Sequence, residues 1–296
     1  MKDEKRRKGY YEDVTTFLVK YTFHTRFFLS RLTKRSRIAK KIIERILFQD
    51  DEIFVLPNKD TVNKTKSRTV IENIEINQSF EEDGSEFVPS EIIKTVIKEA
   101  SDIVIMHKCL CRSSANCQDY PHDLGCIFVG PTSRKIASKY GRTATVEEAL
   151  DHVDKADAAG LSHVIGRNKI DTVWMHVSPK EELLTICHCC PCCCLWKVLP
   201  DLDEDISNKV MRLEDVEVHT VNENCRMCKK CLGCDICFGG AISLVDGKVT
   251  IDQDKCVGCG HCVQICKFNA IELTYTQKSV DSVLNRIGEL VDYKKQ

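Results

Sequence analysis

The sequence predicts an α+β protein, in which a mixed α/β, cysteine-rich N-terminal and middle region precedes a small cysteine-rich domain. Two observations predict this. Helical and strand-like patterns alternate through residues 49–200, and all nineteen cysteines of the 296-residue chain lie between positions 109 and 266. Hydrophobic residues make up 43% and charged residues 29% of the chain, values that are ordinary for a folded protein.

A basic helical arm is expected over residues 1–48. This segment holds fourteen Lys and Arg against five Asp and Glu, whereas the whole chain has a net charge of −1. Within it, residues 38–47 place their isoleucines and Leu47 on one half of a helical wheel and their charged residues on the other. Two interpretations stay open: the helix packs on the protein body, or it contacts an anionic membrane surface or partner.

Regular elements follow in the predicted mixed α/β domain at 49–200. Residues 53–56 read as a buried strand and residues 91–100 as a helix. A further helix begins at the capping box of Thr145 and Glu148 and ends at Gly160. Residues 172–177 resemble a strand. An acidic linker is expected at 201–218 and a C-terminal helix at 276–296.

The cysteines are expected to be reduced in a cytoplasmic protein. The chain opens with no signal-peptide pattern, and its most apolar stretch, residues 16–29, is broken by Lys20, His24 and Arg26, so no transmembrane helix is predicted. Neighbouring cysteines such as Cys189 and Cys190 are poor disulfide partners. Metal-bound thiolates fit a reducing compartment better.

The strongest motif is Cys256-Val-Gly-Cys259-Gly-His-Cys262-Val-Gln-Ile-Cys266. Its two-residue gaps let three thiolates surround one [4Fe–4S] cluster, while the three-residue gap directs the fourth towards a second cluster. Gly258 and Gly260 suit a backbone that wraps closely in left-handed conformations.

A partial copy of this motif lies upstream. Cys237 precedes Ala241 by four residues, as Cys266 precedes Ala270, so Cys237 is predicted to be the crossing ligand. The preferred assignment gives one [4Fe–4S] cluster to Cys225, Cys228, Cys231 and Cys266, and the other to Cys237, Cys256, Cys259 and Cys262. Cys234 is then spare, although a triad of Cys228, Cys231 and Cys234 is an alternative.

Residues 219–275 resemble the bacterial-type two-cluster ferredoxins. The resemblance implies two pseudo-symmetric halves, each with a short helix and short strands. Lys267 and Phe238 stand where these ferredoxins carry proline, which shapes a turn and is not a ligand. Zinc is the alternative for these cysteines, but zinc sites usually have larger loops between their ligand pairs.

Ten further cysteines suggest an additional centre in the middle region. With His107 and His188 they exceed what one tetrahedral metal binds. Three interpretations compete: a further iron–sulfur cluster, structural zinc, or a thiol redox site in which Arg112 lowers the pKa of Cys111. The ten are Cys109, Cys111, Cys117, Cys126, Cys187, Cys189, Cys190, Cys192, Cys193 and Cys194.

The order of these parts, over residues 89–275, resembles a family of iron–sulfur proteins from anaerobic archaea and bacteria. The matching pieces are Cys109-x-Cys111-Arg112, residues 147–149, residues 159–163, the cysteine run 186–194 and the terminal ferredoxin pair. The resemblance implies extra cluster binding and names no substrate.

The chain is therefore expected to be an iron–sulfur electron carrier, or the electron-transfer subunit of an anaerobic oxidoreductase, that acts with redox partner proteins. No dinucleotide loop and no catalytic residue is recognised, and no nucleic acid is expected as a partner. The alternative is a redox enzyme or sensor whose active metal or thiol site is the middle cysteine cluster, fed by the ferredoxin domain.

Overall fold

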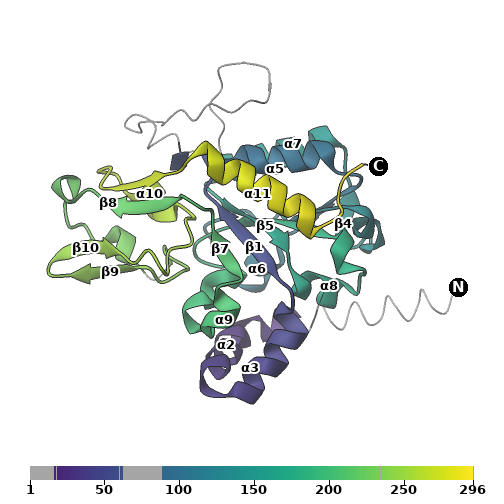
Figure 1. The fold of residues 1–296 in the computed structure, drawn as a ribbon, viewed down its shortest axis with the longest axis horizontal. Coiled ribbons are helices and arrows are strands. Elements are labelled where there is room, and N and C mark those ends of the chain that lie inside the picture. Colours follow the sequence, from purple (N-terminus) through teal and green to yellow (C-terminus); the bar gives the residue numbers. More distant parts are fainter. Residues whose placement is uncertain (1–16, 18, 60, 63–88, 234, 296) are drawn as a thin grey trace, which may run out of the picture.

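A computed structural model describes residue 17 and residues 19–59, 61–62, 89–233 and 235–295. Within this part of the chain, the centre is a seven-stranded sheet with the order β4-β2-β3-β6-β5-β1-β7 (Figure 1). Neighbouring strands are antiparallel except for β1 and β7, which are parallel. The strands are β1 (Glu52–Leu56), β2 (Ile103–Met106), β3 (Ile127–Val129), β4 (Gly141–Thr143), β5 (Ser162–Arg167), β6 (Leu184–Cys189) and β7 (Val210–Arg212). The predicted α+β class is confirmed.

Three helices cover one face of the sheet: α5 (Pro89–Glu99), α7 (Val146–Ala158) and α11 (Gln277–Leu290). The capping box of Thr145 and Glu148 starts α7, and Gly160 follows it at a φ of 75°, both as predicted. Alternate residues of the strands supply the core beneath these helices, because successive strand side chains point to opposite faces. Ile105 of β2 packs there, whereas Val104 and Met106 pack on the other face.

The other face carries the N-terminal segment and short helices. These elements are η1 (Phe23–Thr25), α2 (Arg26–Arg35), α3 (Arg37–Ile43), the π-helical η2 (Glu44–Phe48), α6 (Leu110–Ser114), α8 (Lys169–Met175) and η5 (Leu195–Asp201). The strand expected at 172–177 is wrong, because most of it forms α8. Asp171 fixes this helical turn, since its carboxylate accepts hydrogen bonds from Asn168, Trp174 and Thr185.

The apolar stripe of the arm is only partly buried. Phe48 is buried, and Ile43 and Leu47 pack beside it against the body. Ile38 and Ile42, by contrast, are 74% and 53% exposed. The basic face pairs with the acidic stretch, because Lys40 forms ion pairs with Asp203 and Asp205. The arm thus binds the protein body and also leaves apolar side chains on the surface.

The stretch expected as a linker, 201–218, contains α9 (Glu204–Ser207), β7 and the start of β8 (Glu217–Thr220). β7 pairs with β1, so this stretch extends the central sheet. Beyond it, β8 pairs with β11 (Ile271–Thr274), and β9 (Ile242–Val245) pairs with β10 (Lys248–Ile251). The short helix α10 (His261–Ile265) lies between them in sequence. No helix among the described residues is long and apolar enough to cross a membrane.

Candidate metal centres

The two cysteine motifs of the C-terminal region share an unusual backbone. Met227 and Gly258 occupy equivalent positions before the second cysteine of each motif, and both have positive φ. Lys229 and Gly260, the residues after that cysteine, also match in this respect. A left-handed conformation is uncommon for Met and Lys, so its recurrence indicates that both segments wrap in the same way.

The two cysteines that are predicted to cross over, Cys237 and Cys266, match as well. The backbone N–H of Ala241 donates to Sγ of Cys237 at 3.2 Å, and that of Ala270 donates to Sγ of Cys266 at 3.3 Å. Such N–H groups stabilise an anionic thiolate and lower the energy of a bound anionic cluster.

The structure brings the eight predicted ligands into two groups. The pKa of Cys231 is raised by burial and by the nearby thiols of Cys266, Cys228 and Cys225. The pKa of Cys259 is raised by burial and by Cys262, Cys237 and Cys256. These neighbours are the two quartets of the preferred assignment. Cys234, the spare residue or alternative ligand, lies outside the described residues.

The two quartets differ in depth. Cys228 of the first is exposed, and its partners Cys225 and Cys231 are half-buried. In the second, Cys259 and Cys262 are buried. The first quartet therefore lies nearer to solvent than the second.

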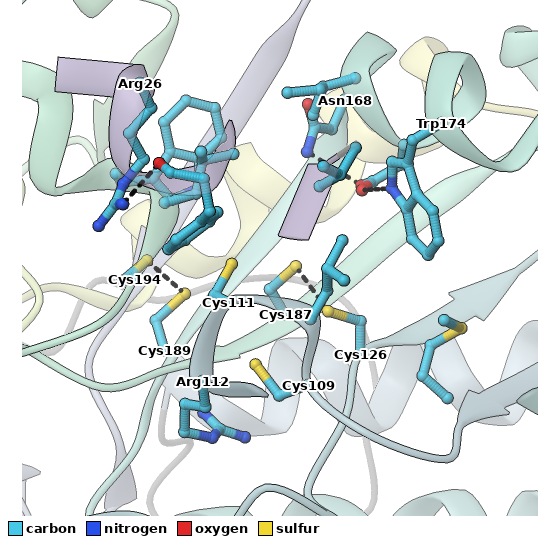
Figure 2. A pocket seen from close by; sticks show the side chains of 18 of the residues that line it. Arg26, Cys109, Cys111, Arg112, Cys126, Asn168, Trp174, Cys187, Cys189 and Cys194 are labelled. Atoms are coloured by element: carbon cyan, nitrogen blue, oxygen red, sulfur yellow. Dashed lines mark hydrogen bonds between the residues drawn. The ribbon is translucent and has the colours of Figure 1, made fainter. Parts of the chain in front are cut away.

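A pocket in the middle region collects a group of six thiols. Strand alternation directs Cys187 and Cys189 of β6 to this face, and α6 begins between Cys109 and Cys111. Figure 2 shows these side chains with those of Cys126 and Cys194 along one side of the pocket. The cavity measures about 290 Å³, and Phe23 and Leu29 of the arm contribute to its lining. Cys190 also reaches the lining, but its thiol belongs to a separate group.

The six pocket thiols lie close to one another. Sγ of Cys126 is 3.2 Å from Sγ of Cys187, and Sγ of Cys194 is 3.1 Å from Sγ of Cys189. A hydrogen bond from the Cys111 thiol, together with the charge of Arg112, lowers the pKa of Cys109 to about 6. The pKa of Cys111 is raised instead, by that same contact and by burial. The expectation that Arg112 lowers the pKa of Cys111 is therefore wrong, because the charge of Arg112 acts on Cys109.

Two arginines give the pocket positive charge. Arg26 faces the thiols from the opposite side in Figure 2, and its charge interacts with Cys111 and Cys194. Its buried Nε has no hydrogen-bond partner among the described residues. Arg112 lies behind the thiols and is 1% exposed. Six thiols, an orphaned guanidinium N–H and a second cation fit an anionic iron–sulfur group.

The other four cysteines form a separate group beside the pocket. Sγ atoms of Cys117, Cys190, Cys192 and Cys193 all lie within 4.8 Å of one another. Of the two histidines considered with the middle cysteines, His107 contacts the carbonyl oxygen of Ser138 at 2.9 Å. His188 lines the pocket, and its Nδ1 lies 2.9 Å from Nδ1 of His163.

The second quartet adjoins the pocket. Cys259 packs in one apolar cluster with Cys189 and Cys194. The hydroxyl of Ser162 joins the two regions, because it donates to the carbonyl oxygen of Cys189 at 3.3 Å and lies 3.1 Å from Nε2 of His261. The second cysteine motif thus meets, through His261 and Ser162, the strand end that carries pocket thiols.

Comparison with known proteins identifies the C-terminal region. The 4Fe-4S binding domain family matches residues 249–272. A subunit of the ion-translocating oxidoreductase complex of Methanosarcina acetivorans is 49% identical over 49 residues, which cover 17% of this chain and 18% of that protein. Electron transport protein HydN of Escherichia coli is 39% identical over 49 residues, covering 17% of this chain and 28% of HydN. Ferredoxin-3 of Nostoc is 34% identical over 55 residues, covering 19% and 48%.

The chain spans less than half the length of each of these relatives. No solved structure matches it. The matching domain and the relatives support an iron–sulfur electron-transfer role for this protein, with 4Fe-4S binding at its C-terminal region.

Sequence reasoning missed Arg26, Ser162 and His261 as parts of these sites. His261 stands inside the ferredoxin motif, which is its one available signal. In the sequence, Arg26 is only a charge that interrupts an apolar stretch. Ser162 lies in the matching piece 159–163, but its role depends on the pairing of β5 with β6.

Proposed function

We propose that this protein relays electrons between an external redox partner and a thiolate-ligated centre in the pocket of the middle region. The observation that carries the proposal is the contact of the second cysteine motif with the pocket strand through His261 and Ser162, beside the apolar cluster that Cys259 shares with Cys189 and Cys194. A ferredoxin that only carried electrons between partners would have no need of a second thiol-lined pocket at its buried end.

The C-terminal domain has one exposed end and one buried end, as an electron relay needs. Cys225, Cys228, Cys231 and Cys266 would hold a [4Fe–4S] cluster at its exposed end, where a partner docks. Cys237, Cys256, Cys259 and Cys262 would hold another at its buried end. When bound, such clusters supply one-electron transfer. The matching left-handed residues in both motifs support Cys225, Cys228 and Cys231 as the first triad over the alternative that includes Cys234.

The pocket would hold a further iron–sulfur group through its six thiols. Arg26 and Arg112 offset the negative charge that several thiolates create in a buried place, where unpaired charge is costly. The apolar side chains around them, including Phe128 and Trp174, keep water away and so help to set the potential.

A redox enzyme or sensor is the second candidate, and the pocket favours it. The thiols face a cavity that Phe23, Leu29 and Trp174 also line, so a small molecule bound there would lie beside the proposed terminus of the relay. Turnover of a small substrate with a reduced electron donor would distinguish this enzyme from a carrier.

The test compares two matched variants, Cys237→Ala and Cys266→Ala, in the full chain purified without oxygen. Intact protein should contain more than about eight iron and eight sulfide ions per chain, because two cubanes alone account for eight of each. Each variant should lose a different ferredoxin-type EPR signal, and both should slow reduction of the pocket centre by an external donor. Unchanged reduction in both variants, or stoichiometric zinc without sulfide, would overturn the proposal.

A further inference from the structure

The group of Cys117, Cys190, Cys192 and Cys193 has the dimensions of a site for a single metal ion. Its Sγ atoms lie within 4.8 Å of one another, and two of the separations, from Cys192 to Cys117 and from Cys192 to Cys190, are both 3.6 Å. A Zn–S bond of about 2.3 Å gives a tetrahedron whose sulfur–sulfur edge is about 3.8 Å.

A polynuclear cluster would need a wider arrangement. The cysteines of a cubane bind separate iron atoms, so their sulfurs are further apart than four ligands of one ion. Among the described residues, this quartet is the one group of three or more metal-ligating side chains that converges so tightly. Two pairs of the six pocket thiols are close, at 3.2 and 3.1 Å, but among the described residues no three of the six converge as tightly as this quartet.

The surroundings are those of a closed site. Cys117, Cys190 and Cys193 are buried, and they pack with the apolar residues Leu124, Ala156 and Leu161. Structural zinc sites have four protein ligands and no open position, whereas catalytic sites keep one for water or substrate. Four protein thiols in an apolar setting match the structural type.

We propose that these four cysteines bind one zinc ion, separately from the iron–sulfur group of the pocket. The ion would join two distant segments, because Cys117 follows α6 while the other three lie in the turn after β6. That turn begins beside Cys189 and ends beside Cys194, both of which line the pocket. Zinc would therefore fix the positions of Cys189 and Cys194 in the pocket wall. This structural role does not depend on the electron relay.

The test is metal analysis of the full chain prepared without oxygen, with Cys192→Ser and the matched variant Cys187→Ser. Both residues are half-buried, but Cys187 lines the pocket. We expect one zinc ion per chain in the intact protein and in Cys187→Ser, and at least roughly a tenfold loss of zinc in Cys192→Ser. Retained ferredoxin EPR signals would show that Cys192→Ser is folded.

Cobalt gives an independent readout in the unmutated protein. Growth with Co²⁺ should yield the visible absorption of a tetrahedral cobalt thiolate, and Cys192→Ser should lack it. Absence of zinc and of the cobalt spectrum, or loss of iron and sulfide in place of zinc from Cys192→Ser, would overturn the proposal. Failure of the electron relay would leave the zinc result unchanged, so the two proposals fail separately.

Discussion

Replacing Arg112 with methionine should destabilise the middle region strongly. The guanidinium donates to the carbonyl oxygens of Pro121 at 2.8 Å, His188 at 2.7 Å and Leu124, and the residue is 1% exposed. Methionine keeps much of the volume but leaves three carbonyls without this donor. A buried unsatisfied group costs about 1–3 kcal/mol, so the expected loss is about 3–5 kcal/mol after relaxation.

Urea unfolding under anaerobic conditions, followed by tryptophan fluorescence, measures this loss. With a slope of about 2–3 kcal/mol per molar, the midpoint should fall by about 1–2.5 M. Arg134→Met is the control, because its side chain is 70% exposed and pairs with Asp102 at the surface. This control should change the midpoint far less, because an exposed ion pair contributes little to stability. If Arg112→Met changes the midpoint no more than Arg134→Met does, the three hydrogen bonds do not stabilise the fold and the reasoning is refuted.

Three further predictions concern pH, the arm and the ferredoxin backbone. Burial raises the pKa of Asp51 to about 7, above the value of about 3.9 for an unfolded chain, so the native state holds this proton more tightly and loses stability as the pH rises towards 7. In the unmutated protein the free energy of unfolding should therefore fall by about 1 kcal/mol per pH unit between about pH 5.5 and 7, and Asp51→Asn should remove this fall. Equal pH dependence of the free energy of unfolding in both proteins would contradict this. Deleting residues 1–48 should release iron from the pocket and spare the ferredoxin EPR signals, since the arm supplies part of the pocket wall. Unchanged total iron would show that the arm is only a docking element and does not support the pocket. Gly260→Ala should lower the iron bound at the second quartet, because a Cβ there would overlap the side chain of Thr61. Gly247→Ala is the control, because it has the same left-handed strain but open space around it among the described residues. Equal iron content in the two variants would refute the steric argument.

Local signals explain which elements of the fold the sequence predicts well. The helix α7 has a capping box at its start and a glycine at its end, and β1 is a short apolar run before Pro57. Neighbouring residues in the sequence therefore set the bounds of both elements. The strand prediction for 172–177 is wrong because tertiary contacts of Asp171 outweigh the β-branched residues that suggest a strand. The exposure of Ile38 likewise depends on how the arm lies on the body, which helical periodicity alone does not give.

For the candidate sites too, local sequence signals predict one part and the folded structure decides the other. Spacing alone predicts the ferredoxin ligands, because the predicted ligands lie within two copies of one motif. Spacing does not separate the ten middle cysteines. Cys189 and Cys190 are adjacent yet turn towards different groups, since the strand ends between them, and Cys117 joins Cys190 only through the packing of α6 beside β6.

The most direct test of the central claim is freeze-quench EPR and Mössbauer spectroscopy of the full chain, mixed with a reduced viologen. If electrons enter at the exposed quartet and pass inward, the ferredoxin-type signals should appear first, and reduction of the pocket iron should follow with a measurable lag. In Cys237→Ala the second step should be at least roughly tenfold slower, because the buried ligand set next to Cys189 is incomplete. Pocket iron that is reduced before the ferredoxin signals appear, or a pocket with no redox-active iron, would contradict the relay.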